Sequence, residues 1–252
     1  MTNKIALVTG GSRGLGKNMA IALAKKGIDV IITYNSNKDA ADSVVKEIQS
    51  AGRKAKAFRL DTSDVAAFDA FLSDVSAWTN AEYGKPGFDY LVNNAGTALY
   101  ATVTEVTEQQ MDTIYNIHYK GVFFLTQKAL RIMHDGGGIV NISSGLTRIT
   151  AVGSSVYGSL KAAVETLTRY MAKELGPRKI RVNVVAPGAI ETDFGGGRVR
   201  DNKDINAQIA SLTALGRVGL PDDIGGVVAF LCTEDARWIN AQRIEVSGGQ
   251  AI

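Results

Sequence analysis

The stretch Thr9-Gly10-Gly11-Ser12-Arg13-Gly14-Leu15-Gly16 follows the apolar run 5–8 directly and precedes an amphipathic segment. Glycines let a backbone approach a pyrophosphate closely, and the N-terminus of the following helix supplies free N–H groups and a partial positive charge. The glycine spacing differs from the common G-x-G-x-x-G, so a plain tight turn is the alternative interpretation. We predict a dinucleotide phosphate-binding loop with six residues at the ligand: Gly10, Ser12, Arg13, Gly14, Leu15 and Gly16.

Beyond this loop, short apolar runs recur along the chain with helix-length segments between them. They cover residues 5–8, 30–32, 57–60, 90–92, 139–142, 182–185 and 244–246. A parallel pair of strands needs a crossover of about a dozen or more residues, whereas a hairpin needs about two, so this rhythm predicts parallel strands joined by helices. The predicted fold class is α/β: a Rossmann-type, doubly wound parallel sheet with helices on both faces, formed by residues 1–252 as a single domain.

The composition argues against several other classes of protein. Charged side chains make up 21% of the 252 residues and nearly cancel, at a net charge of +3, so we expect no nucleic-acid partner. Cys232 is the single cysteine and lies in an apolar run, which indicates a small core residue. His118 and His134 have no partner at a metal-binding spacing, so no metal site is assigned. The first apolar run is short, so we expect neither a signal peptide nor a membrane span. We therefore expect a cytoplasmic protein.

The predicted helix over residues 108–133 carries more apolar surface than one sheet face can cover. Its apolar residues spread beyond the stripe of ~100° that a sheet-covering helix needs. A second long helix is predicted over residues 155–175, ended by Gly176 and Pro177. Closed symmetric assemblies commonly bury such surplus surface. We therefore predict that these helices pair with their copies in a homo-oligomer, with a homotetramer expected and a dimer as the alternative.

The end of the predicted second strand indicates which dinucleotide binds. A free ribose is normally held by a carboxylate at the carboxyl end of that strand. Asp29 has the right spacing but begins the strand, away from the crevice. The carboxyl end carries three uncharged residues instead: Tyr34, Asn35 and Ser36. Arg13 and Lys38 offer positive charge to a 2′-phosphate, so we predict NADP(H), with NADPH preferred over NADH; an Arg13 that is only solvated is the alternative.

A tyrosine and a lysine in the second long helix are spaced for proton transfer. Tyr157 and Lys161 are four residues apart and therefore share one helix face. A free tyrosine titrates near pH ~10. At roughly 4 Å and an effective dielectric of about 20, one ammonium favours phenolate by around 4 kcal/mol, or about three pKa units before desolvation is subtracted. We therefore predict that Lys161 brings the pKa of Tyr157 toward neutrality.

Five motifs in the same order resemble those of the short-chain dehydrogenase/reductase family. They are the loop 9–16, the run Asn93-Asn94-Ala95-Gly96, the spacing of Ser144 and Tyr157, the pair Tyr157-x-x-x-Lys161, and Pro187-Gly188. The resemblance spans nearly the whole chain. Its ending, with Gly216-Arg217, Pro221 and Ser247-Gly248-Gly249, is similar to the branch that contains 3-oxoacyl-[acyl-carrier-protein] reductases. The resemblance implies a reversible, NADPH-dependent reduction of a ketone to an alcohol, with a 3-oxoacyl thioester as a candidate substrate.

The resemblance also implies roles for single residues. Tyr157 would act as the general acid toward the carbonyl oxygen, Ser144 would hydrogen-bond that oxygen, and Lys161 would hold the nicotinamide ribose and lower the pKa of the tyrosine. The hydride belongs to the cofactor, so the protein supplies orientation and charge stabilisation. The residues implied at the cofactor are Asn94, Ala95 and Gly96 along it, Asp61 and Thr62 near the adenine, Ile190 and Thr192 at the carboxamide, and Tyr157, Lys161, Pro187 and Gly188.

One position departs from the family pattern. Three residues before Gly121 the family usually has an asparagine, which helps to hold a water that links the lysine to bulk solvent; here that position is His118. Asn116 lies two residues away, on a different face. The departure puts the proton relay in doubt, whereas hydride transfer does not depend on it. We hypothesise that His118 is a catalytic-site residue that retains the water site, with a purely structural histidine as the alternative.

The sequence leaves the substrate open. A sugar, a diketone or a steroid are alternatives to the thioester. Arg131 and Arg178 would face an acidic carrier protein, or else serve as helix-end partners and solvated charges. Residues 193–213 are polar and contain Gly195, Gly196 and Gly197, which indicates a mobile substrate lid or, alternatively, a plain surface loop.

Two rival functions follow from the same cofactor loop. A non-catalytic NAD(P)-sensing module would need the loop without the chemistry, and the intact Ser144, Tyr157 and Lys161 argue against it. An epimerase or dehydratase would use the same tyrosine, but such enzymes resemble longer chains with an added substrate domain. The 252 residues here leave little room for one.

Overall fold

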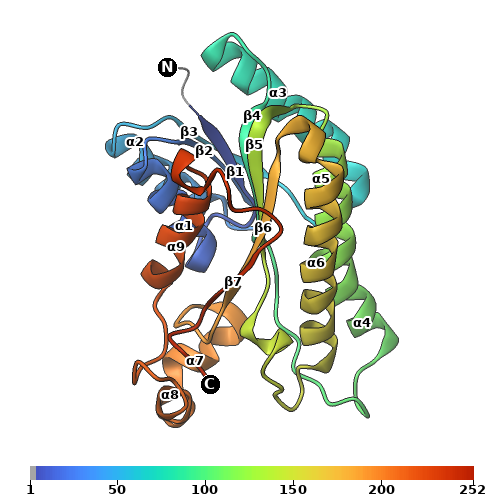
Figure 1. The fold of residues 1–252 in the computed structure, drawn as a ribbon, viewed down its shortest axis with the longest axis vertical. Coiled ribbons are helices and arrows are strands. Elements are labelled where there is room, and N and C mark those ends of the chain that lie inside the picture. The colour runs from blue at the N-terminus through green and yellow to red at the C-terminus, as the bar shows by residue number, and fades with distance from the viewer. Residues whose placement is uncertain (1–3) are drawn as a thin grey trace.

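Seven parallel strands form one sheet in the computed structural model of the protein, which describes residues 4–252 (Figure 1). The strands are β1 (Ile5–Val8), β2 (Asp29–Tyr34), β3 (Ala55–Arg59), β4 (Phe88–Asn93), β5 (Met133–Ile142), β6 (Arg181–Pro187) and β7 (Arg243–Val246). Their order across the sheet is β3-β2-β1-β4-β5-β6-β7, so the chain reverses its direction of travel across the sheet at β1. Open α/β sheets bind ligands outside the carboxyl ends of the strands at such a reversal. The predicted fold class is confirmed.

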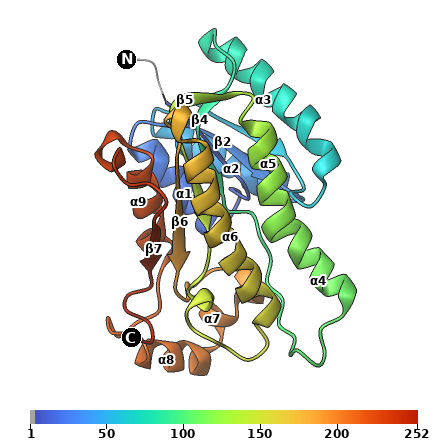
Figure 2. The ribbon, with the colours of Figure 1, turned by 45° about the vertical axis from the view of Figure 1, so that its right-hand side comes forward.

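Helices cover both faces of the sheet (Figures 1 and 2). One layer contains α1 (Gly14–Lys25), α2 (Lys38–Ser50) and α9 (Pro221–Leu231), and the other contains α3 (Phe68–Tyr83), α5 (Gly121–Ala129) and α6 (Ser155–Glu174). Buried apolar side chains pack each layer against the strands, among them Met19, Leu23, Val44, Ile48 and Val228 on the first face and Phe71, Val75, Leu125, Leu167 and Met171 on the second. Central strands buried on both sides are expected to be continuously apolar, as the run Ile5–Val8 is.

The helix predicted over residues 108–133 ends earlier and is interrupted. A capping box of Thr107 and Gln110 starts α4 (Glu108–Tyr115), a π-helical turn, η2 (Asn116–Lys120), follows, and α5 then ends at Ala129. Met133 instead begins β5. The first six residues of this strand include Gly136, Gly137 and Gly138, so they lack the apolar pattern that predicts a strand. The second long helix is confirmed, since α6 occupies nearly the whole predicted range.

Residues 193–213 are more regular than the predicted loop. They contain η5 (Phe194–Gly197), α7 (Arg198–Asp201) and α8 (Lys203–Ser211), and the three glycines of η5 have φ values of 62°, 73° and 75°. The remaining short turns are η1 (Val65–Ala67), η3 (Gly145–Thr147), η4 (Gly176–Arg178) and η6 (Glu234–Ala236). Cys232 is buried in the core, as predicted. Within residues 4–252, no helix has the length and apolar character needed to cross a membrane.

Candidate active site

The glycine loop between β1 and α1 forms a cradle that only glycine backbone can make. Gly10 and Gly14 have φ values of 65° and 54°, which other residues rarely adopt. A Cβ atom added at Gly16 would lie 2.1 Å from the carbonyl oxygen of Gly10. α1 begins at Gly14, and the side chain of its N-cap residue, Arg13, makes no capping hydrogen bond. The first N–H groups of α1 therefore remain available to an anionic group, which fits a dinucleotide pyrophosphate.

Thr9 holds this cradle to the end of β4, a role that the sequence analysis missed. Its hydroxyl accepts hydrogen bonds from the backbone N–H groups of Asn94 and Ala95, at 2.9 and 3.0 Å. The Asn94 side chain returns a bond of 2.8 Å to the Thr9 carbonyl oxygen. Asn94 therefore contributes first by shaping the loop. The position of Thr9, between the strand and the first glycine, is the sequence signal that could have identified this role.

The structure places an arginine, Arg59, at the carboxyl end of β2. Asp29 lies buried at the opposite end of the strand, where it accepts hydrogen bonds from the Lys54 N–H and the Tyr83 hydroxyl, as its position in the sequence predicted. Arg59, the last residue of β3, lies in register with Tyr34 and donates to the Asn35 carbonyl oxygen at 3.1 Å. Sequence reasoning missed Arg59 because its proximity to Asn35 depends on strand pairing.

The two cations predicted to meet a 2′-phosphate, Arg13 and Lys38, differ in whether they already have an ion-pair partner. Arg13 is exposed and forms no ion pair within residues 4–252, whereas Lys38 pairs with Asp42 one helical turn away. Asp61 accepts a hydrogen bond of 2.9 Å from the Ser63 N–H at the carboxyl end of β3. Thr192 lies over the cradle, 3.7 Å from the position that a Cβ atom would take at Gly14. Arg13 and Arg59 are therefore the cations best placed to meet a 2′-phosphate.

The predicted catalytic residues come together at the carboxyl end of β5. Tyr157 and Lys161 project from α6 and Ser144 follows β5, and the lysine ammonium lies 5.6 Å from the centre of the Tyr157 ring. Lys161 is buried and donates a hydrogen bond of 2.7 Å to the carbonyl oxygen of Ile142. Ser144 lies within hydrogen-bonding reach of the Tyr157 hydroxyl. A polar group between Ser144 and Tyr157 would therefore meet two hydroxyls at once.

The pKa prediction for the tyrosine is wrong in this structure. Burial raises the pKa of Tyr157 above its ordinary value, although part of the residue is exposed, and the hydrogen bond with Ser144 offsets the rise only in part. Burial also lowers the pKa of Lys161 to about 8. Desolvation opposes the charged form of both groups and outweighs the attraction expected from their spacing. Tyr157 consequently keeps its proton at neutral pH, which is the form that can donate to a carbonyl oxygen.

His118 lies in the π-helical turn and is almost completely buried beside the tyrosine. Its ring centre is 5.1 Å from that of Tyr157, and the two rings are nearly perpendicular. Nε2 lies 2.8 Å from the Thr97 carbonyl oxygen and 3.2 Å from the Thr97 backbone nitrogen; the shorter contact assigns the proton to Nε2, which then donates to the carbonyl oxygen. Nδ1 is then the acceptor, and it is buried with no hydrogen-bond partner among the described residues. Burial and the Lys161 charge lower the pKa of His118 to about 3, so the imidazole is neutral.

Gly96 makes room for this histidine. A Cβ atom at Gly96 would lie 2.5 Å from Cε1 of the His118 ring. Pro187 and Gly188 lie at the end of β6, where a Cβ on Gly188 would come within 2.9 Å of Ser247. Ile190 pairs with Gly219 in an isolated parallel bridge. These predicted cofactor-side residues therefore all lie along the carboxyl edge of the sheet or in the loops that leave it.

Two aromatic residues that the sequence analysis did not single out lie near Tyr157. The Phe194 ring centre lies 5.9 Å from that of Tyr157, and Phe194 is 43% exposed. Tyr100 is 50% exposed, and the guanidinium of Arg198 lies 5.3 Å from its ring centre. A Cβ atom at Gly195 would lie 2.6 Å from the Tyr100 hydroxyl. Phe194, from segment 193–213, and Tyr100, from the connection after β4, therefore form an aromatic rim beside the catalytic tyrosine.

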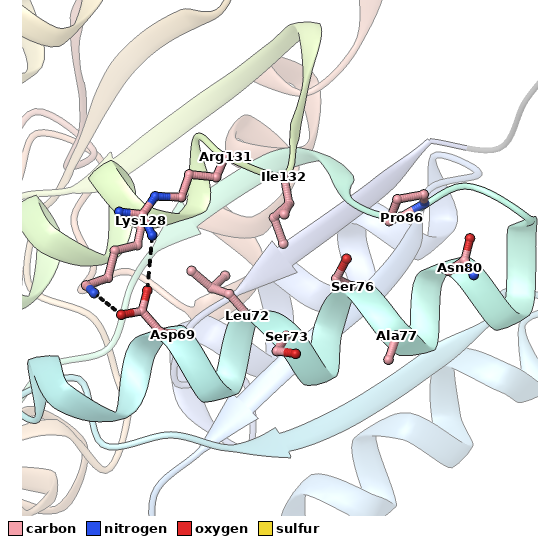
Figure 3. A pocket seen from close by; sticks show the side chains of 10 residues that line it. All are labelled: Asp69, Leu72, Ser73, Ser76, Ala77, Asn80, Pro86, Lys128, Arg131 and Ile132. Atoms are coloured by element: carbon pink, nitrogen blue, oxygen red, sulfur yellow. Dashed lines mark hydrogen bonds and ion pairs between the residues drawn. The ribbon is translucent and has the colours of Figure 1, made fainter.

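Arg131 and Arg178 lie far from this rim. Arg178 is used internally, donating to Asp135 and to the carbonyl oxygens of Leu130 and Met133. Arg131 pairs with Asp69 in a recess between α3 and the end of α5, on the flank where β4 and β5 begin (Figure 3). Lys128 pairs with the same carboxylate. Both arginines thus lie toward the amino ends of the strands, and the interpretation that they face an acidic carrier protein stays a prediction.

Comparisons with known proteins agree with this geometry. The family model described as enoyl-(acyl carrier protein) reductase matches residues 10–251. A hydroxynaphthalene reductase-like protein of Metarhizium brunneum is 36% identical over 260 residues, covering 99% of this chain and 95% of its own. The structure of a promiscuous reductase that catalyses keto-reduction at C1 during lugdunomycin biosynthesis has a TM-score of 0.94 and 39% identity, over 100% of this chain and 99% of its own. That of an angucycline C-6 ketoreductase with bound NADP has a TM-score of 0.93 and 35% identity, over 98% and 95%.

The fold, the glycine cradle and the group formed by Ser144, Tyr157 and Lys161 define a dinucleotide-dependent oxidoreductase. The chain belongs to the short-chain dehydrogenase/reductase family. The predicted family, enzyme class and cofactor, NADP(H), are confirmed, the last because solved relatives of similar sequence contain NADP. The cradle at Gly10, Gly14 and Gly16 fits that cofactor on its own geometry.

Proposed function

We propose that the protein is an NADPH-preferring ketoreductase whose substrate is a flat aromatic ketone. The observation that carries the proposal is the Tyr157 hydroxyl beside Ser144, with the Phe194 ring against that of Tyr157 and the exposed Tyr100 nearby. Exposed aromatic rings next to a reacting hydroxyl favour a planar apolar ligand, because rings stack with offset or edge contacts. The names of the similar proteins support this class, since they include a hydroxynaphthalene reductase-like protein and an angucycline ketoreductase.

The chemistry follows from the positions of three side chains. Ser144 and Tyr157 would both hydrogen-bond the carbonyl oxygen, which orients the ketone and favours negative charge on that oxygen. The hydride is supplied by the nicotinamide of NADPH when it is bound. Tyr157 passes its proton to the oxygen as the alcohol forms, and the Lys161 ammonium stabilises the phenolate that remains until solvent returns a proton.

A panel of ketones tests the substrate class. NADPH oxidation is measured with a bicyclic aromatic ketone such as 1-tetralone, with an acetoacetyl thioester, and with a diketone, a sugar and a steroid. We expect the aromatic ketone to give the highest kcat/KM, because only it stacks against both Tyr100 and Phe194. A preference for the thioester would instead favour the 3-oxoacyl reductase interpretation. No oxidation with any carbonyl would revive the sensing or epimerase functions.

The alkaline limb of the pH profile is expected to report Lys161. The ammonium is present below its pKa of about 8 and is lost above it. We expect kcat/KM for ketone reduction to be level near neutrality and to fall about tenfold per pH unit above pH ~8. Lys161→Arg keeps the charge, so its lower activity should show no such limb. A wild-type profile that stays flat to pH ~10 would contradict the assignment.

We propose that His118 helps solvent to return a proton to the Tyr157 phenolate, through a water molecule held at its unpaired Nδ1. A neutral acceptor buried beside Lys161 suits a water molecule better than it suits an empty core. We expect His118→Leu to lower kcat by at least about tenfold, with KM and thermal stability nearly unchanged. His118→Asn keeps an acceptor and serves as the matched variant. If both variants keep the wild-type rate and pH profile, the histidine is structural.

The assembly and the lid are further parts of the proposal. Met111 and Tyr115 on α4 and Tyr170 on α6 are between 40% and 65% exposed, which supports pairing of these helices in a homotetramer. Sedimentation that finds a monomer at micromolar concentration would contradict it.

Residues 193–213 are proposed to close over the substrate from the rim at Phe194. A cytoplasmic location stays a prediction.

A further inference from the structure

Glu165 lies one helical turn beyond Lys161, on the face of α6 that carries the catalytic residues. Tyr157, Lys161 and Glu165 are spaced four residues apart, so they lie along one face of the helix. That face meets the carboxyl end of β5, where the strand runs through Ile142 into Ser143 and Ser144. The Glu165 side chain is only 13% exposed. A carboxylate at this depth needs partners, and those partners identify what it does.

One oxygen of Glu165, Oε1, collects three contacts from separate segments. The Ser143 hydroxyl donates to it at 2.7 Å, the Thr147 hydroxyl lies 2.8 Å away, and Nε of Arg243 donates at 2.8 Å. Arg243 also pairs with Glu245, at 2.8 Å, so the arginine keeps a carboxylate partner without Glu165. Charge-assisted hydrogen bonds of this kind are the stronger ones in proteins. Glu165 therefore ties α6 to both sides of Ser144.

The two hydroxyls that Glu165 contacts bracket the catalytic serine. Ser143 immediately precedes Ser144, and the Thr147 hydroxyl also lies 3.0 Å from the Ser144 carbonyl oxygen. The Lys161 ammonium bonds the carbonyl oxygen of Ile142 at 2.7 Å, which fixes the other end of the same short stretch. Among the described residues, the Ser144 hydroxyl itself accepts a single backbone hydrogen bond, from the N–H of Leu146 at 3.2 Å. Its direction thus depends on a backbone that is held from α6.

We propose that Glu165 is a positioning residue that aims the Ser144 hydroxyl at the carbonyl oxygen. It acts through Ser143 and Thr147 and touches neither substrate nor cofactor. The inference rests on the proposed ketoreductase function, because it assigns Glu165 an effect only through Ser144. Small misplacements of a catalytic group cost large factors in rate, which makes the effect measurable.

A double-mutant cycle between Glu165 and Ser144 tests the proposal. In the wild-type background, Glu165→Ala is expected to lower kcat about 10- to 100-fold, with the Kd of NADPH, measured by fluorescence, within about twofold. In the Ser144→Ala background, the same substitution should change kcat by less than about twofold, since no serine hydroxyl is left to aim. Glu165→Gln retains an acceptor oxygen and should recover most of the rate. If Glu165→Ala does not fold, Glu165→Asp withdraws the acceptor and replaces it in the cycle.

Glu245→Ala is the matched control. It removes a carboxylate that both Arg243 and Arg148 contact but leaves the contacts of Glu165 with Ser143 and Thr147 in place, so kcat should change by less than about twofold in either background. An equal loss from Glu165→Ala in both backgrounds would overturn the proposal, as would an unchanged rate or a loss that Glu245→Ala reproduces. A Ser144→Ala enzyme that is as fast as wild type would overturn the proposed mechanism itself, and this inference with it.

Discussion

Tyr157→Phe is expected to lower kcat for ketone reduction by about a thousandfold. The substitution removes the phenol hydroxyl that lies beside the Ser144 side chain and serves as the proposed general acid, and loss of a general acid costs roughly 10²- to 10⁴-fold. The ring is retained, so contacts with Phe194 and His118 and the fold should persist. Steady-state kinetics gives kcat, and fluorescence titration with NADPH, expected to change less than about threefold, shows that the cofactor site is intact.

The control is another tyrosine of the same helix. Tyr170 is 65% exposed on α6, and Tyr170→Phe should leave kcat within about twofold of wild type. Carbonyl turnover that survives Tyr157→Phe would remove the general acid from the mechanism. Because α6 and the cradle do not depend on this hydroxyl, such a result would leave the fold and the cofactor assignment standing.

Arg13→Ala is expected to weaken the use of NADPH selectively. Arg13 is the exposed cation of the cradle and has no ion-pair partner within residues 4–252, so a 2′-phosphate is the natural partner for it. Bonds to charged groups contribute ~1.5–3 kcal/mol, which corresponds to a fall of roughly 10- to 100-fold in kcat/KM for NADPH. The kcat/KM for NADH, which lacks that phosphate, should change by less than about threefold. Kinetics with both cofactors measures the ratio.

Two further variants sharpen this comparison. Asn35→Asp places a carboxylate where a free ribose would be bound, so it should raise the relative use of NADH further. Lys25→Ala makes the same charge change as Arg13→Ala at the other end of α1, and the ratio should stay at the wild-type value. Equal loss with NADPH and NADH in Arg13→Ala, or a wild-type enzyme that prefers NADH, would contradict the proposed preference.

Features that depend on short-range spacing could be predicted from the sequence. The cradle at Gly10 to Gly16, the pair Tyr157 and Lys161, and the placement of Asp29 at the start of its strand all follow from neighbours along the chain. The seven strands followed from the same apolar rhythm. The exception was the start of β5, where glycines replace apolar residues and the helix pattern before it gave no stop.

Features that depend on packing could not be predicted in this way. Arg59 reaches Asn35 only because β2 and β3 pair, and Phe194 reaches Tyr157 only because the chain after β6 returns over the site. The prediction of a lowered pKa for Tyr157 was wrong for the same reason. The spacing gives the attraction of Lys161 for the phenolate but not the desolvation that opposes it. For Arg178 the sequence left a carrier contact, a helix-end partner and a solvated charge as alternatives, and only the structure identifies its partners: Asp135 and the carbonyl oxygens of Leu130 and Met133.

The aromatic rim and the proton-donating group come from different parts of the architecture. Ser144, Tyr157 and Lys161 are fixed by β5 and α6, whereas Tyr100 and Phe194 are delivered by connecting segments outside the strands. Connecting segments accept substitutions and insertions more readily than packed elements do. The range of ketones accepted can therefore diversify, by natural drift or by directed evolution, while the reducing chemistry stays constant.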